Sequence, residues 1–243
     1  MRLAVIGHLS RDVIADGPPR IGGPPWHAGR ALRAMGADAA IIAKCGEEDA
    51  VDFARALETL DLPFELAVGE RTTAFSFSYD ADGTRTMNVD AVGDPWLAEE
   101  IRLDGAEWLL VSSVLRGEID VAAVAAGRHV LLDGHGLVRR PEVGPLRLDA
   151  DFDRSSLREV EMLKLADDEA AVVGEVDVPE VIVTHGARGA TVSGVHVAAD
   201  PVEGDPTGAG DMFAAAYLVS RSEGALPVAA ARRATAVVAE LLR

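Results

Sequence analysis

Short apolar runs rich in β-branched residues alternate along this chain with stretches rich in Ala and Leu. The runs are bounded by turn residues and fall at 3–7, 39–43, 107–112, 129–133 and 180–184. Stretches with helical periodicity lie between several of these runs, at 26–35, 48–60 and 118–126. Strands that alternate with helices form parallel sheets covered on both faces. The sequence therefore predicts an α/β fold, a three-layer sandwich with a mostly parallel central sheet.

Residues 73–89 depart from this alternation. Residues 73–79 (TAFSFSY) alternate between apolar and polar side chains, residues 80–83 (DADG) favour a turn, and residues 84–89 run back. This pattern predicts a β-hairpin with one apolar and one polar face. Such a hairpin suits a flap over a site better than a buried strand. Its apolar face would also suit pairing across a homodimer.

Charge and composition narrow the function classes. The 243 residues include 40 acidic and 23 basic side chains, and the formal net charge of −17 repels the phosphate backbone of nucleic acids. Only Lys44 and Lys164 are lysines, and neither follows a Gly-rich turn as a Walker-type nucleotide site requires. We therefore expect a protein that binds no nucleic acid and has no P-loop.

The sequence shows no segment that predicts export or membrane insertion. The single Cys45 cannot form an internal disulfide, the N-terminal run turns polar at His8, and no apolar run is long enough for a membrane span. The chain has no internal repeat and no Pro-, Gly- or Ser-rich linker that would separate two domains. We expect one cytoplasmic domain, residues 1–243, with no membrane partner.

A Gly-rich turn at residues 205–210 (DPTGAG) leads into residues 214–219 (AAAYLV), which predict a helix. Small residues leave the backbone N–H groups of the turn uncovered, and the helix start adds partial positive charge, so the segment predicts an anion site. Asp211 falls in the first helical turn, beside the expected anion. Acidic residues are common helix caps, but capping would not require a glycine on both sides of Ala209.

This pattern favours phosphoryl transfer, in which positioning and charge neutralisation do most of the catalysis. The anion hole of Gly208, Ala209 and Gly210 would hold the negative charge that develops on the transferring group. Asp211 would orient the acceptor hydroxyl and take its proton. Because a carboxylate near a helix N-terminus is expected to be a weak base, late proton removal suits it better than prior ionisation of an alcohol.

Residues 205–213 resemble the second signature of the ribokinase-like (PfkB) carbohydrate kinases, written D-T-x-G-A-G-D. Five further segments resemble that family in its own order: 5–12, 22–23, 32–38, 42–49 and 181–190. The resemblance implies transfer of the γ-phosphoryl group of ATP with Mg²⁺, and it allows a monovalent cation as a further cofactor. The acceptor would be an alcohol of a small polyhydroxylated molecule, a sugar or an inositol. A small β-lid would form from about 8–20 and 72–92.

The resemblance also implies site residues. Asp12, Gly22 and Gly23 would hold substrate hydroxyls, and His27 stands where the family usually has a sugar-contacting Asn. Arg139 is a candidate contact for a substrate anion. The nucleotide side would be lined by four residues: Thr184, Gly186, Gly189 and Thr207. Glu169, in the segment that resembles the N-x-x-E motif, would help to place magnesium through water.

Two departures from the family pattern leave an alternative open. Ala166 replaces the Asn of the N-x-x-E motif, and Thr235 replaces an Asn of the last helix. A non-catalytic sensor that binds sugar or nucleotide is therefore an alternative. The presence of Asp211 together with the complete Gly-Ala-Gly turn argues against it.

Residues 132–139 (LDGHGLVR) and Pro206 are similar to segments of the inositol kinase-like branch of the family. A nucleoside kinase is the other alternative, and it would need an apolar slot from Trp26, Phe75 or Phe77. Asp133 and His135 suggest a metal pair, but two residues make no complete metal site. His135 is therefore interpreted as a loop residue near the cleft.

Overall fold

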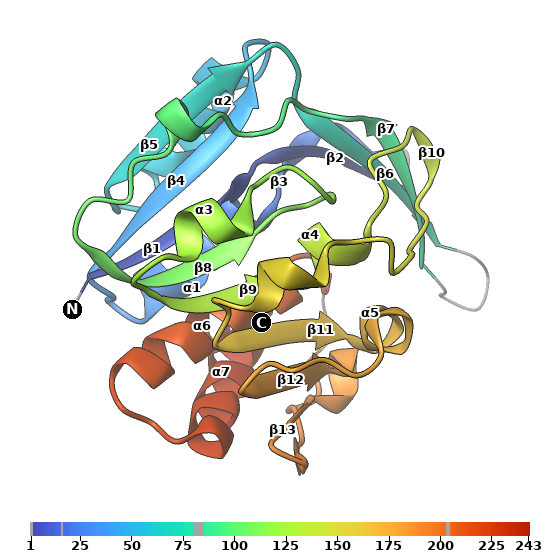
Figure 1. The fold of residues 1–243 in the computed structure, drawn as a ribbon. Helices are drawn as coiled ribbons and strands as arrows, with labels where there is room; N and C mark the ends of the chain where they lie inside the picture. The colour runs from blue at the N-terminus through green and yellow to red at the C-terminus, as the bar shows by residue number, and fades with distance from the viewer. Residues whose placement is uncertain (1, 16, 80–84, 203–204) are drawn as a thin grey trace.

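The computed structural model describes residues 2–15, 17–79, 85–202 and 205–243, and in this part of the chain the strands form two sheets (Figure 1). The larger sheet contains β1 (Arg2–His8), β4 (Ala39–Gly46), β5 (Phe64–Gly69), β8 (Ala106–Ser112), β9 (His129–Asp133), β11 (Met162–Ala166), β12 (Glu180–Thr184), β13 (Ala190–Val192) and β14 (Val195–Val197). Its order is β14-β13-β12-β11-β9-β8-β1-β4-β5. All neighbours from β12 to β5 pair in parallel, and only β13 and β14 are antiparallel.

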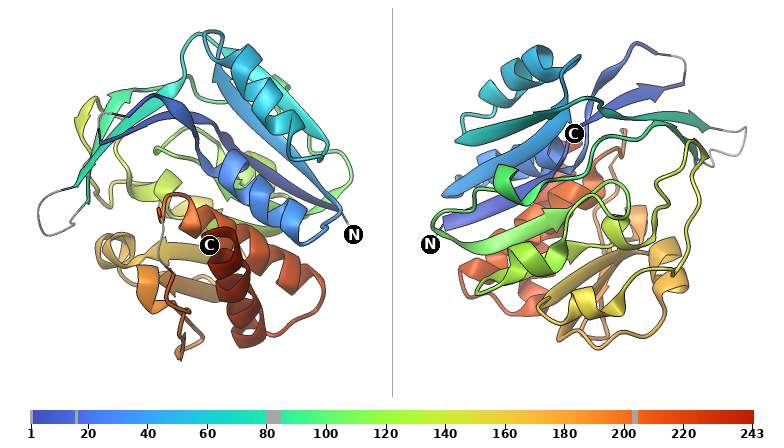
Figure 2. Two further views of the ribbon diagram at one scale, coloured as in Figure 1. Left: turned by 180° about the vertical axis from the view of Figure 1, so that it is seen from behind. Right: turned by 45° about the horizontal axis from the view of Figure 1, so that its top comes forward.

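Helices cover both faces of this sheet. They are α1 (Pro24–Ala34), α2 (Ala50–Glu58), α3 (Val121–Ala125), α4 (His135–Val138), α5 (Asp167–Val173), α6 (Ala209–Ser222) and α7 (Pro227–Leu241), with 3₁₀ turns at Ala98–Glu100, Arg154–Leu157 and Gly186–Arg188. α1, α2, α6 and α7 lie together on one face (Figure 2), whereas α3 and α5 pack on the other. The predicted three-layer α/β sandwich with a mostly parallel sheet is therefore confirmed.

Alternation along the strands explains the two hydrophobic layers. In β1, Leu3 and Val5 pack toward α1 and α6, whereas Ala4 and Ile6 pack toward the opposite layer. Strands buried on both faces appear as continuous apolar runs, which is why most of them could be predicted. The predicted helix at 118–126 is shorter in the structure, because Asp120 caps the N-terminus of α3 by accepting a hydrogen bond from the backbone N–H of Ala123.

The second sheet has the order β10-β7-β6-β2-β3 and projects from the carboxyl edge of the first (Figure 1). It contains β2 (Ser10–Ile14), β3 (Arg20–Gly22), β6 (Thr73–Tyr79), β7 (Arg85–Ala91) and β10 (Gly144–Pro145). β6 and β7 pair in antiparallel register as the arms of the predicted hairpin. Its predicted turn, residues 80–83, lies outside the described residues, as does residue 16 of the predicted lid. Movement of this sheet as a lid stays a prediction.

None of the helices described here combines the length and the apolar composition that crossing a bilayer requires.

Candidate active site

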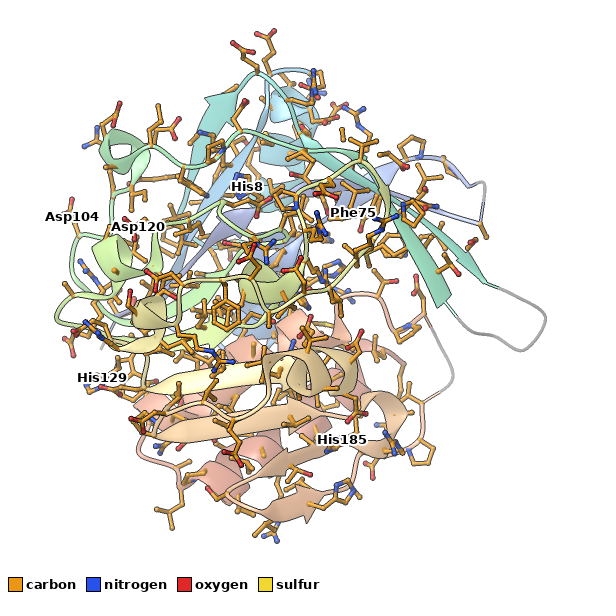
Figure 3. All side chains as sticks on the ribbon, turned by 45° about the vertical axis from the view of Figure 1, so that its right-hand side comes forward. His8, Phe75, Asp104, Asp120, His129 and His185 are labelled. Carbon is orange, nitrogen blue, oxygen red and sulfur yellow. The ribbon has the colours of Figure 1, made fainter. Side chains whose placement is uncertain are left out.

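A cavity of about 520 Å³ opens where the second sheet faces the carboxyl ends of the parallel strands. This is the edge at which open α/β sheets bind ligands. Figure 3 labels Phe75, on the second sheet, and His185, beside β12, which mark two sides of the cavity. Phe75 itself lines the cavity, and so do Thr184 and Gly186, which flank His185.

Most residues that the sequence singled out line this cavity. Of the residues predicted to bind substrate, Asp12, Gly23, His27 and Arg139 line it. The residues predicted for the nucleotide, the anion hole and the base all line it too: Thr184, Gly186, Gly189, Thr207, Gly208, Ala209, Gly210 and Asp211. Gly22 and Glu169 do not line it but support residues that do. The structure thus brings together segments from both ends of the chain.

The Gly-rich turn forms the N-terminus of α6. Gly208 is the N-cap in a left-handed conformation with φ of 77°, which glycine adopts without strain. Asp205 orders the turn by accepting hydrogen bonds from the Thr207 backbone N–H at 3.0 Å and from its hydroxyl at 2.6 Å. Burial raises the pKa of Asp205, but hydrogen bonds from Arg20 and Thr207 outweigh it and lower this pKa to about 2. The turn is therefore fixed before any anion arrives.

Asp211 lies in the first turn of α6 and is 8% exposed. One carboxylate oxygen, Oδ1, accepts no hydrogen bond from the residues that the structure describes. Burial raises the pKa of Asp211 to about 7, with the Asp133 carboxylate adding to the shift and Lys164 opposing it. The expectation of a weak base is therefore wrong, because burial outweighs the helix N-terminus. A pKa near 7 suits a general base at neutral pH.

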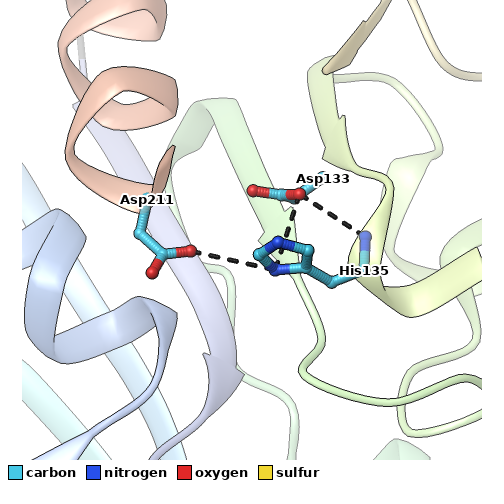
Figure 4. Close-up of side chains that lie close together, drawn as sticks. All are labelled: Asp133, His135 and Asp211. Atoms are coloured by element: carbon cyan, nitrogen blue, oxygen red, sulfur yellow. Dashed lines mark hydrogen bonds and ion pairs between the residues drawn. The ribbon is translucent and has the colours of Figure 1, made fainter. Parts of the chain in front are cut away.

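Asp133, His135 and Asp211 form a cluster at the centre of the site (Figure 4). His135 Nδ1 lies 3.6 Å from Asp133 Oδ1 and 4.0 Å from Asp211 Oδ1, and Nε2 lies 3.4 Å from Glu169 Oε1. His135 begins α4 and is not a loop residue. The cluster corrects the interpretation of Asp133 and His135 as an incomplete metal pair, because Asp211 supplies a third potential ligand from a distant part of the sequence.

Lys164 is a site residue that the sequence reasoning missed. Its side chain is 1% exposed in β11 and lines the cavity, and its Nζ donates to both carboxylate oxygens of Asp133 at 3.1 Å. Asp133 is its direct neighbour on β9. Burial lowers the pKa of Lys164, but the carboxylates around it, Asp133 first, raise it above the ordinary value, so the ammonium stays charged. A Lys within an apolar run was the signal that could have revealed it.

Glu169 lies beneath the cavity and is 1% exposed. Its Oε2 accepts a hydrogen bond from the Ala166 backbone N–H at 2.8 Å, and its Oε1 lies 3.5 Å from Arg139 Nη2. Burial raises the pKa of Glu169, against the effect of Lys164 and Arg139. Ala166 lines the cavity at the position where the family has Asn. Any contact of Glu169 with a metal ion would therefore be indirect.

Asp12 lines the cavity from β2 of the second sheet. It is 3% exposed, and its Oδ1 accepts a hydrogen bond from the Ser10 hydroxyl at 2.7 Å. Gly22 is adjacent across the β2–β3 pair, and a Cβ there would lie 2.0 Å from Asp12 Oδ2. Gly22 is therefore needed because the Asp12 carboxylate occupies the space of a side chain.

His27 projects from the first turns of α1 into the cavity wall and is 7% exposed. Neither ring nitrogen has a hydrogen-bond partner among the described residues. Burial lowers the pKa of His27 to about 4, and the nearby Arg30 and Arg20 add to this effect. The imidazole is therefore neutral at physiological pH, with one N–H donor and one acceptor available to a ligand.

Apolar side chains complete both ends of the cavity. Phe75, Phe77 and Met87 line the cavity from the second sheet. Val238 and Ala239 of α7, with Leu242 just after it, line the cavity beside the C-terminal helices. Trp26 does not line the cavity and packs instead in the cluster around Leu9 and Ile41. Of the three aromatic residues considered for a nucleobase slot, Phe75 and Phe77 line the cavity and Trp26 does not.

Comparison with known proteins shows which family and which solved structures this chain resembles. Residues 156–242 match the family model described as pfkB family carbohydrate kinase. The matched segment contains β11, the Gly-rich turn and both C-terminal helices. No curated protein matches the chain in sequence.

Solved structures with the same fold include a pyrophosphate-dependent kinase in the ribokinase family complexed with a pyrophosphate analog and myo-inositol. Its TM-score is 0.87 at 20% identity, over 99% of this chain and 95% of that one. The sulfate complex of a pyrophosphate-dependent kinase in the ribokinase family gives 0.86 at 22% identity over the same shares. A Burkholderia thailandensis nucleoside kinase in complex with inosine gives 0.77 at 20% identity, over 98% and 89%.

The chain thus has the fold of ribokinase-family kinases, and its residues 156–242 match a kinase family model. The matched segment includes residues 205–213, whose resemblance to the ribokinase-like (PfkB) carbohydrate kinases it confirms.

Proposed function

We propose that this protein transfers the γ-phosphoryl group of ATP to an alcohol group of a small cyclic polyol, an inositol or a sugar. The observation that carries the proposal is the position of Asp211. Its buried carboxylate, with one oxygen that accepts no hydrogen bond from the described residues, stands in the cavity beside the N-terminus of α6. A base and an anion hole are thus adjacent, as phosphoryl transfer requires.

The reaction follows from this geometry. Asp211 accepts a hydrogen bond from the acceptor hydroxyl and takes its proton as the new O–P bond forms. The bond between the transferring phosphorus and the leaving phosphate oxygen breaks, and ADP leaves. The backbone N–H groups of Gly208, Ala209 and Gly210 stabilise the negative charge on the transferring group.

The residues present also fit a magnesium ion. Mg²⁺ prefers oxygen ligands and usually keeps several waters. Asp168 and Asp211 offer carboxylate oxygens at the cavity, and Glu169 lies behind Ala166 where it can act through water. When bound, the ion would neutralise charge on the donor phosphates.

The acceptor side favours a neutral cyclic polyol. Asp12 accepts hydrogen bonds from hydroxyl groups, and the neutral His27 ring can both donate and accept. Phe75, Phe77 and Met87 offer an apolar surface for the face of a ring. The fold match to a kinase complexed with myo-inositol, together with residues 132–139 and Pro206, supports an inositol over a sugar as the acceptor.

Two other candidates have specific support. A pyrophosphate donor is suggested by the pyrophosphate-dependent kinases that share this fold and by the buried cation Lys164 at the cavity. ATP is favoured by the apolar wall of Val238, Ala239 and Leu242, which would suit an adenine ring. A nucleoside acceptor is suggested by the inosine-bound kinase and by Phe75 and Phe77.

A matrix of donors and acceptors tests the proposal. The purified protein is incubated with Mg²⁺ and either ATP or pyrophosphate, across inositols, pentoses, hexoses and nucleosides, and products are followed by ³¹P NMR. A new phosphate monoester with ATP and a polyol supports the proposal. If only pyrophosphate supports turnover, the donor is pyrophosphate and not ATP. If only nucleosides are phosphorylated, the acceptor is a nucleoside and not a polyol. Binding without turnover across the whole matrix would favour a non-catalytic sensor.

A further inference from the structure

Lys164 and Asp133 form a buried ion pair directly beneath the anion hole. They are neighbours on the parallel strands β11 and β9, and Lys164 Nζ lies 3.1 Å from both carboxylate oxygens. Lys164 is 1% exposed and Asp133 is fully buried. Removing two such charges from water costs several kcal/mol per ion, which their mutual attraction often fails to recover. Stability is therefore a poor explanation for this pair.

The ammonium of Lys164 lies against the Gly-rich turn. A Cβ on Gly210 would lie 3.1 Å from Lys164 Nζ and 3.7 Å from its Cε. The absence of a side chain at Gly210 thus lets the ammonium reach the wall of the cavity beside the first turn of α6. Lys164 lines that cavity, together with Gly208, Ala209 and Gly210.

The hydrogen-bonding capacity of the ammonium is not used up by Asp133. An ammonium group carries three N–H donors. Both hydrogen bonds that the Lys164 ammonium makes with described residues go to Asp133. A third N–H is therefore available for an anion bound at the turn.

We propose that Lys164 is a catalytic residue whose ammonium donates a hydrogen bond to an oxygen of the phosphoryl group held at Gly208–Gly210, and that Asp133 positions it. This inference rests on the proposed phosphoryl transfer and adds a fixed positive charge to a site that lacks the family's Asn at Ala166. Lys164 binds the charge that grows on the transferring group, so its contribution is larger in the transition state than in the ground state.

The double variant Lys164→Met/Asp133→Asn removes both charges while roughly keeping side-chain volume. We expect it to fold, with a melting temperature no more than about 5 °C below that of the wild type, because the two members of the ion pair are removed together. We expect kcat to fall about 10²-fold or more, with a smaller change in KM for the acceptor. A kcat within about threefold of the wild type would overturn the proposal.

A matched control uses the other lysine. Lys44 is 3% exposed and its Nζ pairs with Glu100 at 2.6 Å, away from the cavity. Lys44→Met/Glu100→Gln therefore removes a second lysine–carboxylate ion pair, in which the lysine is buried and Glu100 is partly buried. We expect it to leave kcat unchanged within about threefold. An equal loss of kcat in the two double variants would assign the effect to general damage and contradict the proposal.

A measurement on the wild type makes the test independent of folding and of turnover. The chain contains two lysines, so lysine labelled with ¹⁵N at Nζ gives two side-chain signals, which Lys44→Met distinguishes. Added inorganic phosphate should shift the Lys164 signal and leave that of Lys44 in place. An unmoved Lys164 signal at saturating phosphate would overturn the inference even if the enzyme is active. A shifted signal in a protein without transferase activity would keep the anion contact and reject the proposed function.

The variant Gly210→Ala provides a third test of the proposed role of Lys164. The new Cβ would press on the Lys164 ammonium and force it to shift, and φ at Gly210 is not in the left-handed region, so the backbone tolerates alanine. We expect kcat to fall about tenfold or more in the wild-type background and to change little in Lys164→Met/Asp133→Asn. Full additivity of the two effects would show that Gly210 does not act through Lys164.

Discussion

The ring of His27 occupies the space in which a side chain on Gly208 would lie. A Cβ at Gly208 would be 2.1 Å from both Cγ and Nδ1 of the imidazole. Helix α1 and the N-terminus of α6 therefore meet at a glycine, where the His27 wall of the cavity touches the Gly-rich turn. This contact joins two segments that are far apart in the sequence into one site.

Gly208→Ala is expected to damage both stability and activity. Alanine in a left-handed conformation costs about 1–3 kcal/mol, and here it would also displace His27. Gly36→Ala is the matched control, because Gly36 has φ of 61° and an added Cβ there would meet no described atom within 4 Å beyond its chain neighbours. Urea unfolding should show a larger loss for Gly208→Ala than for Gly36→Ala. Equal losses, with kinase activity kept in both, would mean that the contact with His27 is unimportant.

The pH dependence of catalysis should report Asp211. With a pKa of about 7, its carboxylate is protonated at lower pH and cannot accept the hydroxyl proton. We expect kcat/KM to rise about tenfold per pH unit below pH 7 and to level off above it. Neither Asp205, with a pKa of about 2, nor His27, with a pKa of about 4, titrates in this range. A profile that is flat from about pH 5 to 8 would reject Asp211 as the base.

The same pKa predicts how stability depends on pH. A carboxyl whose pKa rises from 3.8 to about 7 on folding binds more protons in the folded state, so its contribution to the free energy of unfolding falls as pH rises between these values. Asp211→Asn removes the titrating carboxyl and with it this pH-dependent loss of unfolding free energy. The variant should gain stability over the wild type as pH rises from about 5 to 8, as measured by urea unfolding. A difference between the two proteins that does not change with pH would contradict the raised pKa.

Gly22→Ala should act through Asp12. The added Cβ would lie 2.0 Å from Asp12 Oδ2 and must displace the carboxylate, whereas φ at Gly22 is not left-handed. We expect KM for the acceptor to rise about tenfold with a smaller change in kcat. Asp12→Ala should cause a similar rise, and the double variant should be no worse than Asp12→Ala alone. If the effects of the two substitutions add, Gly22 has a separate role.

The sequence predicted those features that depend on local pattern. β1 and β4 are buried on both faces and therefore appear as uninterrupted apolar runs. The Gly-rich turn before α6 is formed by residues adjacent in the sequence, so it could also be recognised locally. β11 was missed as a strand because Lys164 interrupts its apolar run. Lys164 is buried there because it pairs with Asp133 on β9. Local periodicity cannot predict a pairing between strands that are distant in the sequence.

The chemistry of the site was less predictable than its location. Asp211 was recognised from its place in the turn, but its basicity depends on burial and on the neighbouring Asp133. His135 was interpreted as a loop residue because the third member of its cluster is distant in the sequence. Glu169 was recognised by motif, whereas its inward direction, toward the backbone of Ala166, required the structure.

The most direct test of the account compares Asp211→Asn with the wild type in the transfer of phosphate from ATP to the best polyol acceptor. Asp104→Asn serves as the control, because Asp104 is exposed and far from the cavity (Figure 3). We expect Asp211→Asn to keep the fold and lose about 10²- to 10⁴-fold in kcat, while Asp104→Asn remains fully active. Transfer by a folded Asp211→Asn protein at the wild-type rate would contradict the central claim that this carboxylate is the base.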